Sequence, residues 1–208
     1  MSDANSPLLT AIDKIVEQHA QRLKQACAQF HIALPGRAYP ERSITYFYIG
    51  ALAEALDGGT VIAEVPFPNA DGSISNNHLD AIVFNDEVAI LAEFKRSWTP
   101  NHWLDLAHDI PRVLRLADSI LPRFRDKRSR TLFGFYGSDS WRSQAAHAWK
   151  TGEVYRGWQL PPEFERMNRG AMKVWDRTDD SEALQQTQED GYFWIWACEQ
   201  LLPKASPS

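Results

Sequence analysis

Cysteine is scarce in this chain, and the two that occur, Cys27 and Cys198, lie far apart. They cannot supply the disulfide framework of a small secreted domain or the paired spacing of a zinc site, so we expect two core thiols. The six histidines, among them His78, His102 and His108, likewise show no ligand spacing. Zinc-dependent chemistry is therefore not indicated.

Long apolar runs and a targeting leader are also lacking. No uncharged stretch of the sequence approaches the ~20 residues that a membrane-spanning helix needs. No N-terminal segment pairs a basic start with an apolar run and a cleavage site of small residues. The formal charge of −5 argues against a globally basic nucleic-acid binder. We expect a cytoplasmic protein with no membrane partner, in which a local patch would contact any acidic ligand.

What is present suits one domain over residues 1–208, because 208 residues with 44% hydrophobic side chains can bury a sizeable core. No internal repeat is visible. Hydrophobic spacing predicts helices at 6–30, 40–57, 100–120 and 138–152, and strands at 60–68, 78–84, 87–95, 130–137, 171–178 and 191–199. Residues 69–77 have turn composition, Asn85 and Asp86 suit a hairpin turn, and Pro111 should kink or divide its helix. The tail 202–208 is expected to be disordered. This order of elements predicts an α/β fold.

Three charged residues interrupt the apolar strands at 78–84 and 87–95. If the chain turns at Asn85–Glu87, antiparallel pairing makes Asp80 and Glu93 cross-strand neighbours. Because side chains alternate along a strand, Glu93 and Lys95 point to one face and Phe94 to the other. The three charges should therefore converge.

Two adjacent carboxylates repel each other, and one lysine only partly offsets that repulsion. A divalent cation would offset it fully, and oxygen ligands with open positions for water and phosphate suit Mg²⁺ or Mn²⁺. The lysine could then orient or help deprotonate the attacking water, or balance charge in a phosphoryl transition state.

Asp80, a gap of twelve residues and then Glu93-Phe94-Lys95 resemble the motif of the PD-(D/E)XK nuclease superfamily, whose fold is restriction-endonuclease-like. The resemblance covers roughly residues 40–136, and Leu79 replaces the proline that often precedes the aspartate. It implies a mixed central sheet flanked by helices in the order αβββαβ, here with an extra N-terminal helix and C-terminal additions. It also implies a Mg²⁺-dependent phosphodiester hydrolase that acts on DNA, or less often RNA.

Many members of that superfamily, including those similar to archaeal Holliday-junction resolvases, add a metal-site glutamate from the preceding helix. A helix of about 16 residues and a strand of about 8 have similar lengths, so the end of strand 60–68 lies beside the start of helix 40–57. Glu41 is then near the site, whereas Glu54 lies about three turns away. The run "ERSIT" also resembles the Glu-Arg helix start of these relatives. Glu41 is the predicted third metal ligand, and Glu64 is the competing carboxylate.

The richest basic stretch is a candidate phosphate-binding loop formed by Arg123, Arg125, Lys127, Arg128 and Arg130. A solvated loop is the alternative interpretation. Six of the eight tryptophans lie late in the chain and suit core packing or a homodimer interface better than base stacking. Asp109 resembles an aspartate often found on the following helix, but its position before Pro111 favours helix capping.

Three hypotheses follow. The chain is a metal-dependent nuclease, a catalytically inactive relative of the same fold that serves as a binding module, or an unrelated α/β protein. In the last case, Asp80 and Glu93 would be solvent-facing edge charges. For Glu41 the alternative to a metal ligand is a residue that only stabilises a helix start.

Overall fold

The computed structural model describes residues 7–29, 41–69, 73–96, 99–125, 131–140, 142–176 and 191–201. Within these residues lie the elements α1 (Pro7–Gln29), α2 (Glu41–Ala55), β1 (Thr60–Pro68), β2 (Ile74–Phe84), β3 (Val88–Arg96), α3 (Asn101–Arg125), β4 (Thr131–Ser140), α4 (Ser143–Thr151), the short 3-10 helix η1 (Pro162–Phe164), β5 (Asn168–Asp176) and β6 (Gly191–Gln200). No helix of the described residues carries an apolar stretch sufficient to cross a membrane.

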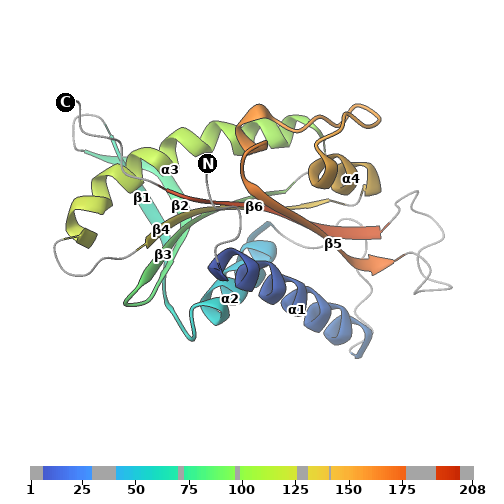
Figure 1. Ribbon diagram of the computed structural model, residues 1–208, viewed down its shortest axis with the longest axis horizontal. Coiled ribbons are helices and arrows are strands. Elements are labelled where there is room, and N and C mark those ends of the chain that lie inside the picture. Colours follow the sequence, from blue (N-terminus) through green and yellow to red (C-terminus); the bar gives the residue numbers. More distant parts are fainter. Residues whose placement is uncertain are drawn as a thin grey trace.

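The strands form one mixed sheet with the order β1-β2-β3-β4-β6-β5. The strands β1, β2 and β3 pair antiparallel, β3 and β4 pair parallel, and β6 pairs antiparallel with both β4 and β5. A parallel pair needs a long crossover connection, which α3 supplies. Figure 1 shows α3 and α4 on one face of the sheet and α1 and α2 on the other. The predicted α/β fold is confirmed.

Helices on both faces give the sheet two hydrophobic cores. Along β3, Ile90, Ala92 and Phe94 pack into the core beneath α1 and α2. The alternate residues Ala89 and Leu91 pack into the core beneath α3 and α4. Burial on both faces explains why this strand is an almost continuous apolar run, and why a charge within it requires a local partner.

The late tryptophans and one of the two cysteines belong to these cores. The four tryptophans of that group with described side chains are Trp149, Trp158, Trp194 and Trp196, and all are buried. Core packing is confirmed for them. Cys198 is a buried thiol, as expected. The side chains of Cys27, Trp141 and Trp175 lie outside the described part of the chain.

The predicted hairpin turn is confirmed, since Asn85 N–H donates to Val88 O and the Asn85 side chain accepts from the N–H groups of Glu87 and Val88. Two predicted boundaries were wrong, and the helix at Pro111 is not divided. The strand β2 begins at Ile74, because pairing with β1 outweighs the turn-like composition of residues 74–77. The helix α3 continues past Pro111 without division, because its apolar face stays packed on the sheet. The strand β4 also extends to Ser140, beyond the predicted start of the next helix.

Tyr48 fixes α2 to the centre of the sheet. Its hydroxyl lies 2.8 Å from Ser138 O and 2.9 Å from Ile195 O, both on buried strands. Its ring stacks on Phe94 at 5.2 Å between centroids. One hydroxyl of α2 therefore contacts two neighbouring strands of the sheet.

Tyr48→Phe should lower the free energy of unfolding by about 1–3 kcal/mol, because it removes the only donor group of a buried side chain that serves two carbonyl oxygens. Chemical denaturation would measure the change. Tyr46→Phe is the matched control, because Tyr46 lies two residues away on α2 and is 68% exposed. Equal effects of the two substitutions would contradict this role of Tyr48.

Candidate functional site

The candidate site lies where β2 and β3 separate. Their ladder ends at the pair Ala81 and Ala92, which places Asp80 and Glu93 at the first unpaired positions. Beyond that point β2 stays paired with β1, whereas β3 continues alongside β4, from the pair Glu93 and Tyr136 onward. The sheet thus opens into a fork, and the two carboxylates lie at its base.

At this fork, each carboxylate accepts a hydrogen bond from the opposite strand. Phe94 N–H donates to Asp80 Oδ2 at 2.7 Å, and Asp80 N–H makes a longer contact of 3.4 Å with Glu93 Oε2. These bonds replace the ladder bonds that the diverging strands can no longer form. The prediction that Asp80 and Glu93 are cross-strand neighbours is confirmed.

The predicted alternation of side chains on β3 is also confirmed. Lys95 Nζ lies 3.0 Å from Glu93 Oε1, on the face opposite the buried Phe94 ring. The same ammonium lies 3.3 Å from Asp109 Oδ2, and the other Asp109 oxygen lies 2.5 Å from Arg112 Nη1. A chain of alternating charges therefore runs from Glu93 to the partly exposed Arg112 on α3.

The expected capping role of Asp109 was wrong. Asp109 lies inside α3, is 4% exposed, and its carboxylate meets Lys95 and Arg112. A sequence signal for this partnership existed, because Asp109 falls on the apolar stripe that includes Leu106 and Val113. A carboxylate on a buried stripe needs a cation, and Lys95 is that cation.

Burial sets the protonation states at the fork. Desolvation, followed by repulsion from Asp80, raises the pKa of Glu93 to about 8, although Lys95 opposes the shift. Burial acts to lower the pKa of Lys95, but attraction to Glu93 and Asp109 outweighs it and raises that pKa. Lys95 therefore stays protonated at neutral pH, which makes it a cation and not a base in this arrangement.

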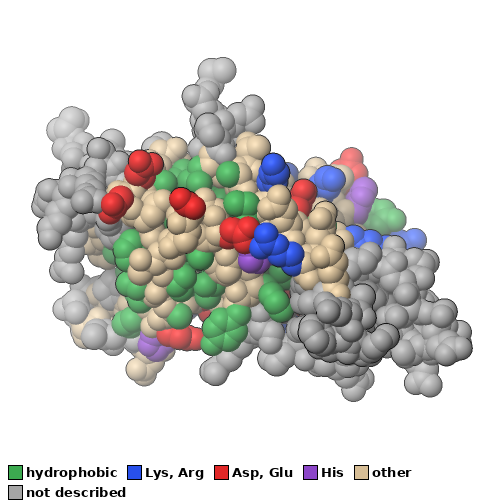
Figure 2. Space-filling model, turned by 90° about the horizontal axis from the view of Figure 1, so that it is seen from below, with side chains coloured by type: hydrophobic (Ala, Val, Ile, Leu, Met, Phe, Trp, Pro, Cys, Tyr) green, Lys and Arg blue, Asp and Glu red, His purple; other side chains and the backbone are tan. Residues whose placement is uncertain are grey.

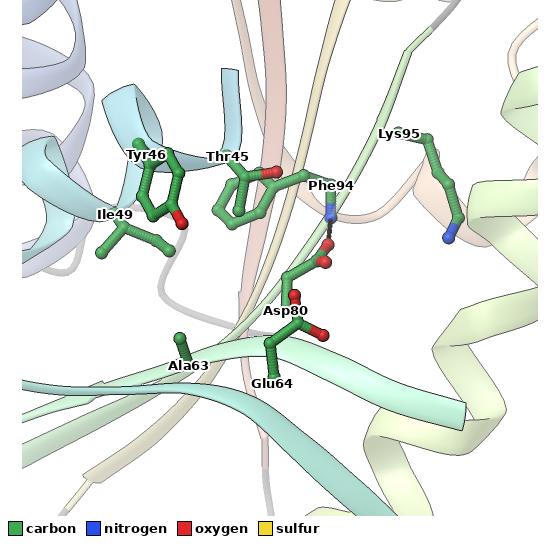
Figure 3. Close-up of a pocket in the computed structure, with 8 residues that line it drawn as sticks. All are labelled: Thr45, Tyr46, Ile49, Ala63, Glu64, Asp80, Phe94 and Lys95. Atoms are coloured by element: carbon green, nitrogen blue, oxygen red, sulfur yellow. Dashed lines mark hydrogen bonds between the residues drawn. The ribbon is translucent and has the colours of Figure 1, made fainter. Parts of the chain in front are cut away.

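A cavity of about 450 Å³ opens beside the fork. Its lining residues are Thr45, Tyr46, Ile49, Ala63, Glu64, Asp80, Phe94 and Lys95. Figure 3 shows the α2 side chains on one side and Glu64 and Asp80, from β1 and β2, on the other. The ammonium of Lys95 turns away from Asp80 toward α3 in this view. Glu93 is 3% exposed and does not line the cavity, whereas Glu64, Asp80 and Lys95 do.

Glu64 lies opposite Asp80 in an unusual backbone conformation. The flanking pairs are Ala63 with Ala81 and Val65 with Leu79. Glu64 has φ of 54°, in the left-handed region that disfavours residues with a Cβ. Such strain costs on the order of 1–3 kcal/mol and concentrates at functional sites. The sequence identified Glu64 only as a competitor, and no local pattern signalled its backbone conformation.

The other predicted residues divide into those placed elsewhere and those outside the described residues. Glu54 lies away from the cavity, where its carboxylate meets His19 and Arg22 of α1 at 2.7 Å and 2.6 Å. Glu41 begins α2, but its side chain is outside the described part, so its predicted role is untested.

The side chains of the candidate phosphate-binding loop also lie outside the described part of the chain. They are Arg123, Arg125, Lys127, Arg128 and Arg130. Figure 2 looks onto the face that carries α1 and α2. The described Lys and Arg side chains there are interspersed with acidic and apolar groups and form no continuous basic surface.

Among the described residues, no three His, Cys, Asp or Glu side chains are arranged to hold a metal ion. The carboxylates that line the cavity are those of Glu64 and Asp80, whereas Glu93 lies outside the lining and is held by Lys95. Two carboxylates remain compatible with Mg²⁺, which commonly takes only one or two from a protein and completes its shell with water and phosphate.

Comparison with known proteins identifies no relative: no protein-family model, no curated protein and no solved structure matches the chain significantly.

The raised pKa of Glu93 predicts how stability depends on pH without metal. Between the unfolded pKa near 4.3 and the folded pKa of about 8, the native state holds a proton that the unfolded state has lost, so stability falls as pH rises through that window. Glu93→Gln should remove this fall, which is at most about 1.4 kcal/mol per pH unit.

Urea denaturation in the presence of a chelator, from about pH 5 to about pH 8, would measure how the free energy of unfolding depends on pH in the wild type and in Glu93→Gln. Glu54→Gln is the control, because that carboxylate is largely solvent-exposed and its pKa is lowered through Arg22. An unchanged slope in Glu93→Gln would contradict the assignment.

Proposed function

We propose that this protein is a metal-dependent phosphodiester hydrolase acting on nucleic acid, with a restriction-endonuclease-like core. One observation carries the proposal: at a fork in a mixed sheet Glu93 contacts both Asp80 and Lys95, and these two residues line the open cavity beside it. The pKa of Glu93 is raised to about 8, and strongly perturbed pKa values cluster at functional sites. DNA is the substrate that the sequence resemblance favours.

The arrangement of elements supports the same proposal. From α2 to β4 the order is helix, three strands, helix and strand, as the resemblance implies. The first three strands pair antiparallel, and the fourth joins parallel to β3 through α3. The helix α1 and the elements after β4 are the N-terminal and C-terminal additions. Catalytic groups on β3 would also be held rigidly, because both faces of this strand are buried.

The donor set fits a hard divalent cation. Asp80 and Glu64 would hold Mg²⁺ or Mn²⁺ through carboxylate oxygens, and Glu93 would join them if its contact with Lys95 loosened. The bound ion would polarise the phosphodiester and lower the pKa of its water. Glu41 remains a further candidate ligand because it lies on the helix that forms one wall of the cavity.

Lys95 contributes positive charge and not general-base catalysis. Its raised pKa keeps the ammonium protonated, so it can offset the charge that develops on a phosphoryl oxygen. Asp109 is a positioning residue, because it holds the ammonium from α3 without lining the cavity. The nearby Glu93 carboxylate holds the same ammonium from the strand side.

The pairing of Lys95 with Glu93 and Asp109 favours a second candidate function, that of a catalytically inactive binding module. The Lys95 ammonium is satisfied by Glu93 and Asp109, and the described residues lack a metal-holding triad. A site whose charges neutralise one another is what a catalytically inactive binding module would retain. Metal binding and cleavage distinguish this hypothesis from the first.

The first experiment measures metal binding by thermal unfolding. Mg²⁺ or Mn²⁺ should raise Tm of the wild type by mass action, and Asp80→Asn and Glu64→Gly should abolish the rise. Without metal, Glu64→Gly should be as stable as the wild type or more so, because glycine tolerates φ of 54°.

Asp57→Gly is the matched control, because Asp57 has φ of 53° and does not line the cavity. Asp57→Gly should also be as stable as the wild type or more so without metal, and it should keep the metal-induced rise in Tm. A metal response that survives Asp80→Asn would place the ion elsewhere.

The second experiment measures cleavage of single-stranded, double-stranded and branched DNA and of RNA. Asp80→Asn and Glu93→Gln should abolish cleavage, whereas Lys95→Gln should lower kcat by about 10²- to 10³-fold and keep the metal-induced rise in Tm. Asp109→Asn should lower kcat less and should not add to Lys95→Gln, because it acts through the same ammonium. Wild type that binds metal but cleaves none of the substrates would favour the binding module.

A further inference from the structure

The cavity beside the fork has two chemically different walls. One wall carries the carboxylates of Glu64 and Asp80 from the edge of the sheet. The other carries Thr45, Tyr46 and Ile49, which the helical repeat of α2 places on one side of that helix. Figure 3 shows these α2 side chains and the two carboxylates on opposite sides of the cavity.

Tyr46 is the aromatic group that core packing leaves available at this wall. It is 68% exposed, whereas Tyr48, two residues later, is fully buried in the core. Aromatic residues bury large areas when they serve packing, so a strongly exposed ring at the mouth of a cavity contributes little to the core. Ile49 and Ala63 continue the apolar surface beside the ring.

We infer that Tyr46 is a stacking platform for an unpaired nucleobase, so that the preferred substrate is single-stranded nucleic acid or an unpaired end or flap. The inference rests on the proposed function and names its substrate class. Once a divalent ion is bound, the acidic wall binds the phosphodiester. The aromatic wall binds the base of the same nucleotide.

Size and geometry favour an unpaired base over a duplex. A volume of about 450 Å³ is within the range of about 300–1,000 Å³ typical of small-ligand pockets, which suits one nucleotide. A base within a duplex has both faces covered by its neighbours, so Tyr46 could stack on it only after it left the helix. Single strands expose their bases, and stacking on aromatic side chains is their usual mode of recognition.

The test compares two chromogenic phosphodiesters with Mn²⁺. The p-nitrophenyl ester of 2-deoxyribose 5-phosphate lacks a base, and the p-nitrophenyl ester of thymidine 5′-monophosphate carries one, so the two share a leaving group and differ in the base. Tyr46→Ala should lower kcat/KM for the thymidine ester by roughly 5- to 100-fold and lower that for the abasic ester much less. Tyr46→Phe should keep both activities, because stacking needs the ring and not the hydroxyl.

Tyr155→Ala is the control, since Tyr155 is a second partly exposed tyrosine and does not line the cavity. Equal losses on both esters in Tyr46→Ala, or no loss on either, would overturn the platform while leaving the hydrolase proposal in place. Failure of the wild type to cleave either ester would instead contradict the hydrolase proposal.

Binding provides a readout that needs no turnover. Fluorescence anisotropy with Ca²⁺ would compare a labelled single-stranded oligo(dT) with a blunt duplex of equal length. Wild type should prefer the single strand, and Tyr46→Ala should remove that preference by weakening single-strand binding roughly 5- to 100-fold. Equal affinity of the wild type for both probes, or binding unaffected by Tyr46→Ala, would overturn the inference whether or not the protein cleaves.

Discussion

The candidate site depends on how the protein closes the gap between β2 and β3. Two strands that diverge leave backbone N–H groups without ladder partners, and buried backbone donors must be satisfied. Asp80 and Glu93 meet that need by accepting from the opposite strand, with Phe94 N–H as the shorter bond. The same bonds hold the two carboxylates at the base of the fork, so the geometry that completes the sheet also positions the proposed chemistry.

Charge balance is the second constraint at this position. Glu93 and Asp109, both almost fully buried, contact the ammonium of Lys95, and Asp80 lies close enough to Glu93 to repel its carboxylate. Desolvation and then repulsion from Asp80 raise the pKa of Glu93 to about 8, and attraction to Glu93 and Asp109 keeps Lys95 protonated. A divalent cation beside Asp80 would relieve the repulsion, which gives metal binding a physical reason independent of any resemblance.

Much of the fold and part of the site were predictable from local patterns. The hairpin at Asn85 was predictable because its side chain caps the turn, and the ladder that follows from it sets Asp80 against Glu93. The roles of Glu64 and Asp109 were not predictable in this way. The role of Glu64 depends on its own left-handed backbone conformation in an edge strand. The role of Asp109 depends on the packing of α3 against β3.

The sequence by itself determined which residues alternate between the faces of β3, since that follows from the two-residue period of a strand. It also determined the order of elements and the neighbouring positions of Asp80 and Glu93. Only the tertiary structure decided which charges are buried and which reach solvent. Glu93 lies outside the lining of the cavity, Tyr46 stays at its mouth, and Lys95 turns to Asp109, because these outcomes depend on how α2 and α3 pack on opposite faces of the sheet.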